Sequence, residues 1–301
     1  MNSNADNPLS IDRPGIDRLE AREVLVWPTA PMPLPSPDEC EFLRSLLPMT
    51  RSSGVVWLDG SRGGDGERRD LHGLSPLPDP ADENRVRDIL TRFQTTSTAW
   101  VKGLLPEYAE AIQVQPATFR PCEEAFRSQT LSGRNDLLHI DHFTRRPTWG
   151  ARILRLFVNI HPSEDRVWML SEPLERILPM ISHRLPVPPR TPAEWLKESK
   201  SLSNFLTGRP RSAYDAWMTR LRDILKADDT FQDRAARRVE HFAPGSAWML
   251  FSDATAHAVL RGQFALEQTW LVPVKALLRP EMAPINILAA KAGDEVRRKA
   301  A

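Results

Sequence analysis

Residues 151–160 read ARILRLFVNI, and this run is the strongest strand signal in the chain. β-Branched and aromatic residues fill its second half, and such residues favour the extended backbone of a sheet. Side chains alternate between the two faces of a strand, so the faces can be separated by counting. The pattern predicts a sheet with a hydrophobic core on one side and a polar cavity on the other. The apolar face holds Leu154, Leu156, Val158 and Ile160, and the mixed face holds Ile153, Arg155, Phe157 and Asn159.

A short motif with metal-ligand spacing precedes this strand. His139-Ile140-Asp141 places a His and an Asp two residues apart, and His257 follows much later in the chain. On extended backbone His139 and Asp141 point to the same side, so they can bind one ion together while His257 completes the site from another strand. Two His and one carboxylate on one face of an octahedron are typical of non-haem Fe(II) oxygenases. Because H-x-D is short, the alternative is an all-β sandwich with buried, hydrogen-bonded His.

Further strand candidates follow in an order that would bring distant ligands together. H-x-D lies near the start of a run of strands, and His257 lies near its end. This order predicts an α+β fold whose core is a double-stranded β-helix, a jelly-roll or cupin-like architecture with flanking helices. The later strands are predicted over 166–170, 239–242, 247–251 and 264–272.

The same patterns divide the chain into parts. A helix is predicted from Ser36 to about Leu47, after a cap and a proline, and another over 82–104, where apolar residues recur at helical spacing. Residues 171–236 interrupt the strands with two apolar stripes at i, i+3, i+4 spacing, which predicts a helical insertion. The expected organisation is a helical and irregular region packed on the barrel (1–120), the β-helix core with its insertion (121–280), and a C-terminal tail (281–301).

Composition fits an enzyme of one large domain. Of 301 residues, 41% are hydrophobic and 26% are charged, and the net charge of +1 gives no reason to expect a nucleic-acid partner. No apolar run approaches the length of a transmembrane helix, and the polar residues 1–13 lack the apolar core of a signal peptide. Only two cysteines, Cys40 and Cys122, are present, which favours a reducing compartment. We therefore expect a cytoplasmic protein.

The motifs from about residue 120 to 275 resemble, in their order, the Kdo 3-hydroxylases, which are Fe(II)- and 2-oxoglutarate-dependent dioxygenases. The N-terminal third resembles that family more loosely. The stretches that carry the resemblance are LHID at 138–141, RPTWGARILRLFVNI at 146–160, RVW at 166–168, RSAYD at 211–215, LRD at 221–223, KAD at 226–228, FAPGSAW at 242–248, HAV at 257–259 and GQFALEQTW at 262–270.

The resemblance implies a reaction and its cofactors. Members hydroxylate C3 of the Kdo sugar in Kdo-lipid A, in the lipopolysaccharide inner core, and give Ko. They use Fe(II), with 2-oxoglutarate and O₂ as cosubstrates, and the resemblance assigns iron ligation to His139, Asp141 and His257. Two alternatives remain: a related dioxygenase acting on another anionic sugar or lipid, and a cupin-like binding module without catalysis.

2-Oxoglutarate needs a cation for its distal carboxylate, because a buried anion without a partner is costly. Some dioxygenases place this base on or after the strand of the last His, where Glu267 has the wrong charge and Arg261 lies in a predicted turn. Others place it on the strand after H-x-D, where Arg155 is on the mixed face and Arg152 is on the other. In order of preference the candidate cations are Arg155, Arg152 and Arg261, with Asn159 and Gln268 as further cosubstrate contacts.

The helical insertion is rich in basic residues. Arg pairs well with phosphates and carboxylates, so these residues could contact the anionic acceptor, although a solvated charged surface is the alternative. Because the acceptor is a lipid and no transmembrane segment is expected, the enzyme should touch the cytoplasmic face of the inner membrane peripherally. The basic residues are Arg184, Arg190, Lys197, Lys200, Arg209, Arg211, Arg220 and Arg222.

Overall fold

Two antiparallel sheets form the centre of the molecule. The computed structural model describes residues 14–51, 54–58, 70–123, 130–143, 147–189, 191–197 and 212–299. Within these residues the larger sheet has eight strands and the smaller has three. The larger sheet runs in the order β1 (Leu25–Trp27), β9 (Ala247–Phe251), β6 (Arg152–Asn159), β11 (Ala265–Val272), β5 (Thr118–Arg120), β2 (Val56–Leu58) and β3 (Leu71–His72), and β4 (Gln113–Val114) also pairs with β11.

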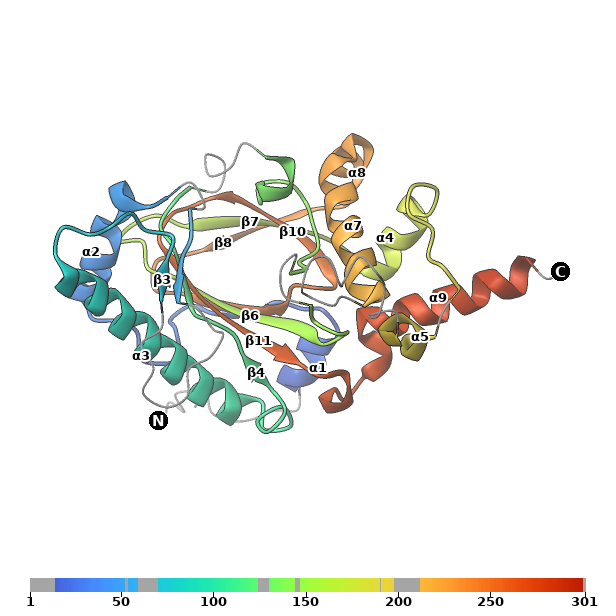
Figure 1. Cartoon of the computed structure of the whole chain (residues 1–301), viewed down its shortest axis with the longest axis horizontal. Coiled ribbons are helices and arrows are strands. Elements are labelled where there is room, and N and C mark those ends of the chain that lie inside the picture. Colours follow the sequence, from blue (N-terminus) through green and yellow to red (C-terminus); the bar gives the residue numbers. More distant parts are fainter. Residues whose placement is uncertain are drawn as a thin grey trace, which may run out of the picture.

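The smaller sheet lies over one face of the larger one. Figure 1 shows β7, β8 and β10 above β6 and β11, so the two sheets face each other. The order of its strands is β10 (Thr255–Arg261), β7 (Arg166–Pro173) and β8 (Arg238–Phe242).

The faces of β6 are divided as the sequence predicts. Leu154, Leu156 and Val158 are fully buried in the main hydrophobic core, and each such side chain contributes about 1.5–3 kcal/mol of stability. The opposite face, with Arg155 and Phe157, turns toward the smaller sheet. β6 pairs with β11 along its whole length without a bulge, so the alternation is not reversed anywhere on this strand.

Helices cover the outer face of the larger sheet. Helix α3 (Pro80–Leu104) runs along that face in Figure 1, and Trp270 of β11 donates from its indole to Thr98 of α3 at 3.0 Å. Helix α2 (Pro37–Ser45) begins with a capping box between Ser36 and Glu39, which confirms the predicted start. The remaining elements on this side are α1 (Pro14–Glu20) and the 3₁₀ turn η1 (Leu47–Met49), whereas the 3₁₀ turn η3 (Leu131–Gly133) packs against helix α7 (Ala213–Ala227).

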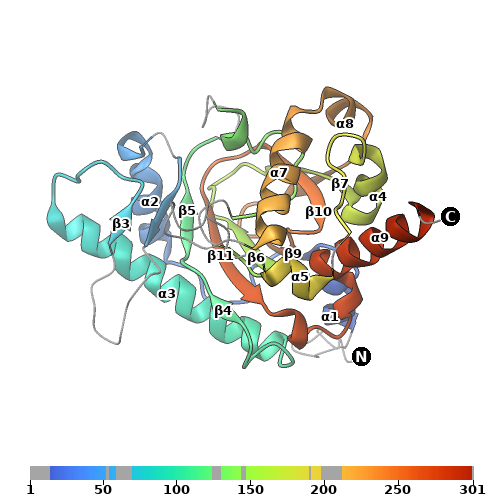
Figure 2. The ribbon, with the colours of Figure 1, turned by 45° about the vertical axis from the view of Figure 1, so that its right-hand side comes forward.

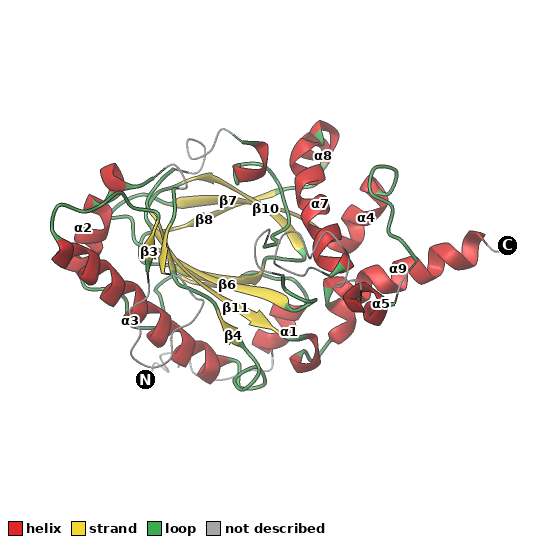
Figure 3. Ribbon diagram, viewed as in Figure 1, coloured by secondary structure: helices red, strands yellow, loops and turns green. Residues whose placement is uncertain are grey.

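A second group of helices gathers at one end of the sheets, as Figures 2 and 3 show. Most belong to the predicted insertion, and both predicted apolar stripes are buried, apart from a half-buried Ile224. The insertion's residues 198–211 lie outside the described ranges. The group comprises α4 (Leu174–Ile181), α5 (Pro192–Lys197), α7 (Ala213–Ala227), α8 (Asp229–Arg234) and α9 (Pro284–Lys299), and η5 (Val274–Ala276) and η6 (Pro280–Met282) precede α9.

Three expectations need correction. The region before residue 121 is not only helical and irregular, because β1 to β5 come from it; strands of two or three residues are too short to show alternation. The H-x-D segment is not a regular strand, since only an isolated bridge joins His139 to His257. Arg261 is not in a turn but is the last residue of β10, and its side chain is exposed.

Candidate metal centre

The two predicted His ligands lie directly opposite each other across two chain segments. The amide of His139 donates to the carbonyl of His257 at 3.0 Å, and the reverse bond is 2.9 Å. Residues that exchange both backbone hydrogen bonds project their side chains to the same face. The two imidazole rings accordingly lie with their centroids 4.8 Å apart.

Each imidazole is held by a backbone carbonyl two residues earlier. Nδ1 of His139 lies 2.7 Å from the carbonyl oxygen of Leu137, and Nδ1 of His257 lies 3.0 Å from that of Thr255. A carbonyl can only accept, so Nδ1 carries a proton in both rings, and Nε2 is the atom of each ring that could bind a metal. This second hydrogen bond is the usual way in which proteins orient a metal-binding His.

Asp141 completes a group of three converging donor atoms. Its Oδ1 lies 3.6 Å from Nε2 of His139, and its Oδ2 lies 3.5 Å from Nε2 of His257. One donor atom from each residue lies within 4.8 Å of the others. Metal bonds of about 2.0–2.2 Å to nitrogen and oxygen would fit an ion between atoms at such separations. These three residues, hereafter the triad, are thus brought together as the sequence predicts.

The protonation states of the triad suit a cation. Burial lowers the pKa of His139 to about 4, so its ring is neutral at pH 7. Burial alone would raise the pKa of Asp141, but the positive charge of Arg155 and the contacts with both His rings hold it well below its usual range. The group therefore offers the neutral ring of His139 and the carboxylate of Asp141, and with His257 it has the residue types of a facial triad.

Aromatic rings support the triad from the smaller sheet. The Trp168 ring stacks on that of His257 with centroids 5.3 Å apart and planes 12° from parallel. Trp168 is itself packed against Phe157, Phe242 and Trp248, all of them buried. This cluster fixes the orientation of His257 and keeps water from one side of the centre.

A chain of alternating charges leads away from the triad along the larger sheet. Nε of Arg155 lies 3.1 Å from Asp141, and its Nη1 lies 2.8 Å from Glu267. Glu267 also accepts from Arg120 at 2.5 Å and from Thr269 at 3.0 Å. Burial would raise the pKa of Glu267, but the two arginines outweigh it and lower that pKa.

Arg120 and the pairing role of Glu267 are features that the sequence analysis missed. Arg120 lies on β5, whose three residues give too short a pattern to recognise. Glu267 has the wrong charge to bind 2-oxoglutarate, and its sequence context does not show that it pairs with two arginines. The register of β11 between β6 and β5 is what places Glu267 between two cations.

Other predicted cosubstrate contacts lie elsewhere. Arg152 is fully buried on the opposite face of β6, with Nε 3.0 Å from both oxygens of Asp253. The side-chain amide nitrogen of Asn159 donates to the backbone carbonyls of Glu164 and Phe242, at 2.8 and 2.9 Å. Gln268 lies on the outer face of β11 and donates to the carbonyl of Gln115, and Arg261 is exposed. Among the five candidates, Arg155 alone contacts the triad.

Helix α7 braces the segment that carries H-x-D. Oδ1 of Asp215 on α7 lies 3.3 Å from Nε2 of His142 and accepts from the amide of Thr148 at 2.7 Å. Its other oxygen accepts from Ser212 at 2.6 Å. Arg222, two turns further along the helix, donates to the carbonyl of His142 at 3.3 Å. His142 is therefore a buried structural contact, beside the triad rather than part of it.

Comparison with known proteins identifies the family. The family model of 3-deoxy-D-manno-oct-2-ulosonic acid (Kdo) hydroxylases matches residues 4–295. The chain belongs to the Kdo hydroxylase family. The family predicted from the sequence motifs is thereby confirmed. No curated protein matches the chain.

Solved structures of one family member share the fold. Crystal structures of the Kdo hydroxylase KdoO, a non-heme Fe(II) alpha-ketoglutarate-dependent dioxygenase, match at 29% identity over 95% of this chain and 91% of theirs. The TM-score is 0.79 for the complex with succinate and Fe(III), 0.78 for that with alpha-ketoglutarate and Fe(III), and 0.79 for that with cobalt(II). The chain thus has the mixed α/β fold of KdoO, with antiparallel sheets and flanking helices. Among the described helices, none combines the length and apolarity needed to cross a membrane.

Proposed function

We propose that the protein is an Fe(II)- and 2-oxoglutarate-dependent dioxygenase that hydroxylates C3 of Kdo in Kdo-lipid A and gives Ko. The observation that carries the proposal is the convergence of two Nε2 atoms and one carboxylate of the triad within 4.8 Å. Membership of the Kdo hydroxylase family supplies the substrate class. C3 is the carbon that lacks a hydroxyl in a 3-deoxy sugar.

In this proposal the triad binds the iron. Bound iron, together with 2-oxoglutarate and O₂, supplies the oxidising power for C–H hydroxylation, and 2-oxoglutarate is converted to succinate and CO₂. The carbonyls of Leu137 and Thr255 would hold Nδ1 of both rings and so aim both Nε2 atoms at one point. Trp168 and its aromatic neighbours exclude water from this side. A dry site strengthens every charge interaction inside it.

Arg155 is our proposed partner for a carboxylate of 2-oxoglutarate. It is buried, it lies on the face of β6 that turns toward the smaller sheet, and it contacts Asp141. Arg120 is the second candidate, because it reaches the other oxygen of Glu267. Glu267 would hold both guanidinium groups in place through charge-assisted hydrogen bonds.

We further propose that the two facing sheets form a double-stranded β-helix. In support, the smaller sheet is extended by the bridge from His139 to β10, and all its pairings are antiparallel. The catalytic core would cover 121–280 with its insertion at 171–236. The region 1–120 would pack on the core and add strands to its sheet, and 281–301 would form a helical tail.

The acceptor would be reached at the cytoplasmic face of the inner membrane, through peripheral contact. Two basic residues of the insertion support this, since the side chains of Arg184 and Arg220 are substantially exposed. Arg222 is engaged with His142 instead. Arg190, Lys200, Arg209 and Arg211 lie outside the described residues. A dioxygenase acting on another anionic sugar remains the second candidate function.

The test combines iron binding, cosubstrate turnover and product analysis. The wild-type protein should bind one Fe(II), release succinate only with iron, and add one oxygen to Kdo-lipid A. His139→Ala, Asp141→Ala and His257→Ala should each reduce succinate release by more than about 100-fold, since losing even an outer-shell partner costs 10–100-fold. The exposed His241 provides the control, and His241→Ala should stay near wild type. Full turnover in any triad variant would show that the substituted residue is not an iron ligand.

A further inference from the structure

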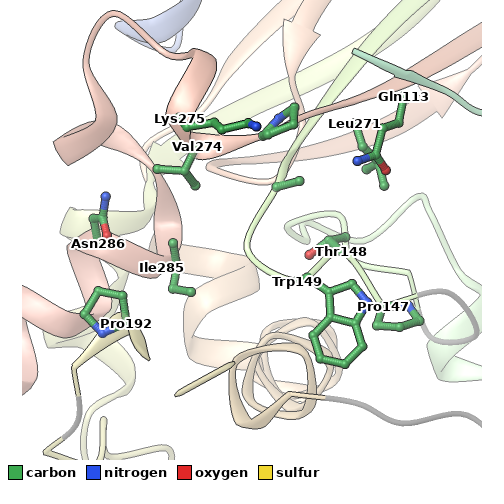
Figure 4. Close-up of a pocket in the computed structure, with 12 residues that line it drawn as sticks. Gln113, Pro147, Thr148, Trp149, Pro192, Leu271, Val274, Lys275, Ile285 and Asn286 are labelled. Carbon is green, nitrogen blue, oxygen red and sulfur yellow. The ribbon is translucent and has the colours of Figure 1, made fainter. Parts of the chain in front are cut away.

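An open cavity of about 470 Å³ lies beyond the end of β11, and no triad residue lines it. Figure 4 shows that its walls come from segments far apart in the chain. They include the loop before β6, the starts of α5 and α9, and the turn after β11. The lining residues are Gln113, Pro147, Thr148, Trp149, Ala151, Pro192, Leu271, Pro273, Val274, Lys275, Ile285 and Asn286.

The cavity is connected to the candidate metal centre by packed side chains. Two of its lining residues, Ala151 and Leu271, form a hydrophobic cluster with Ile153 and Phe143. The Arg155 guanidinium lies 5.6 Å from the centre of the Phe143 ring, and Arg155 contacts Asp141 of the triad. Residues 151, 153 and 155 share one face of the sheet, and four residues of strand span about 13 Å. The cavity therefore lies beside the centre, on the same sheet face, but not in it.

Trp149 is held at the cavity in a conformation that costs energy. It is 42% exposed, and its φ of 54° is in the left-handed region that bulky residues rarely adopt. Its neighbours fix the loop: Thr148 bonds twice to Asp215, and Gly150 packs against Ile285 so closely that a Cβ would lie 2.9 Å from the Ile285 side chain. Such strain persists where the surroundings impose it, often at ligand sites.

The polar groups of the cavity are few and are available to a ligand. Lys275 is exposed and, within the described part of the chain, pairs with no carboxylate. The Gln113 side chain is likewise exposed, and Asn286 uses only its amide nitrogen, toward Pro280. None of the lining residues is acidic, so the cavity has one positive charge among mostly apolar walls. Apolar walls with a few placed polar groups are typical of small-molecule sites.

We propose that this cavity binds the anionic sugar next to the Kdo unit that is hydroxylated. The apolar face of the sugar ring would stack on Trp149, its carboxylate would pair with Lys275, and its hydroxyls would bond Gln113 and Asn286. This proposal rests on the proposed function. The hydroxylated unit itself does not fit here, since Phe143 and Ile153 stand between the cavity and the triad. An acyl chain would leave the ammonium and both amides without partners.

The experiment measures substrate binding and turnover in paired variants. Lys275→Gln and Trp149→Ala should each raise KM by about tenfold, near 1.4 kcal/mol, for a deacylated saccharide of two linked sugar acids. Neither should change kcat, the KM for 2-oxoglutarate, or the rate measured with free Kdo as acceptor. Lys275→Arg and Trp149→Phe should retain most of the affinity. Lys102→Gln and Val239→Ala, which remove an exposed Lys and an exposed apolar side chain elsewhere, are the controls.

Three results would overturn the proposal. One is an unchanged KM for the two-sugar probe in both variants. Another is weakening confined to intact Kdo-lipid A, because that would assign the cavity to an acyl chain. The third is an equal loss for free Kdo, which would place the hydroxylated sugar here. If Trp149→Ala unfolds at a lower temperature than the wild type, Lys275→Gln alone serves as the test of the proposal. A wild-type protein that oxidises 2-oxoglutarate but hydroxylates no Kdo saccharide would instead refute the proposed function.

Discussion

At the scale of single residues, the candidate centre depends on which ring nitrogen of each His points toward Asp141. Each His donates its Nδ1 proton to a carbonyl of its own segment, so Nε2 faces Asp141. Arg155 neutralises Asp141 from the other side at 3.1 Å. Arg155 thus balances the charge of Asp141 before any ion binds, and the addition of a divalent cation would leave a positive site for an anionic cosubstrate.

Arg155→Gln should therefore raise the 2-oxoglutarate concentration required for turnover. Loss of one partner from a buried charge pair costs about 2–5 kcal/mol, which is roughly 30-fold or more in affinity. Iron binding should change little, because all three triad donors remain. Arg261→Gln removes an exposed arginine and serves as the matched control. Titration of succinate release against 2-oxoglutarate makes the measurement, and an effect in Arg120→Gln but not in Arg155→Gln would transfer the role to Arg120.

At the scale of elements, α7 and α8 are the support of the H-x-D segment. Asp215 on α7 holds His142 and Thr148, which flank the loop between the triad and β6. Gln232 on α8 accepts from the Leu138 amide at 3.0 Å and donates to the Leu138 carbonyl at 2.9 Å. Because H-x-D is not part of a long strand, these helices replace the ladder bonds that would otherwise fix its backbone.

Asp215→Asn should weaken both the fold and the metal centre. Burial would raise the pKa of Asp215, but hydrogen bonds from His142 and Ser212 lower it below its usual value. A lowered folded pKa means that the carboxylate stabilises the fold above about pH 4 and loses this effect as pH falls through the folded value. We expect a loss of about 2–4 kcal/mol at pH 7 that shrinks below pH 4.

Urea unfolding of the metal-free protein at pH 7 and at pH 3.5 measures the effect of Asp215→Asn, and iron titration measures the centre. The exposed Asp233 on α8 gives the control variant Asp233→Asn. A stability difference from wild type that is the same at both pH values would contradict the charge argument. Unchanged iron affinity would show that α7 does not position the H-x-D segment.

At the scale of the whole molecule, the helices are divided into two groups with different surroundings. Helix α3 covers the outer face of the larger sheet, while α4, α5, α7, α8 and α9 gather at one end (Figure 2). The cavity with Trp149 lies beside this second group. A lipid-linked acceptor that approached this end would meet the basic residues of the insertion and the cavity together.

Arg184→Gln with Arg220→Glu tests that approach. Each cation near an anionic membrane contributes about 1 kcal/mol, and salt screens it. The pair should lower hydroxylation of Kdo-lipid A in anionic vesicles by about tenfold or more at low salt, spare succinate release without acceptor, and approach wild type at high salt. Arg92→Gln with Lys102→Glu on α3 removes equal charge, and it breaks a similar exposed ion pair. Equal product from both pairs at both salt concentrations would exclude docking through the insertion.

The sequence by itself indicated the family, most of the long strands, the helices α2 and α3, the helical insertion and the three residues that converge. These signals are local: β6 alternates over eight residues, α2 shows its cap, and His139 and Asp141 are two residues apart. The alternation of side chains along β6 also placed Arg155 and Arg152 on opposite faces of the strand correctly, because no bulge interrupts it.

The tertiary structure alone decided what surrounds these residues. Arg120 and Glu267 meet because β11 lies between β5 and β6, and no local pattern encodes that register. Asp215 reaches His142 across 73 residues of chain, and the cavity joins five separate segments around Trp149. Strand register and helix packing result from the burial of the whole core, so the contacts they create cannot be read from short stretches of sequence.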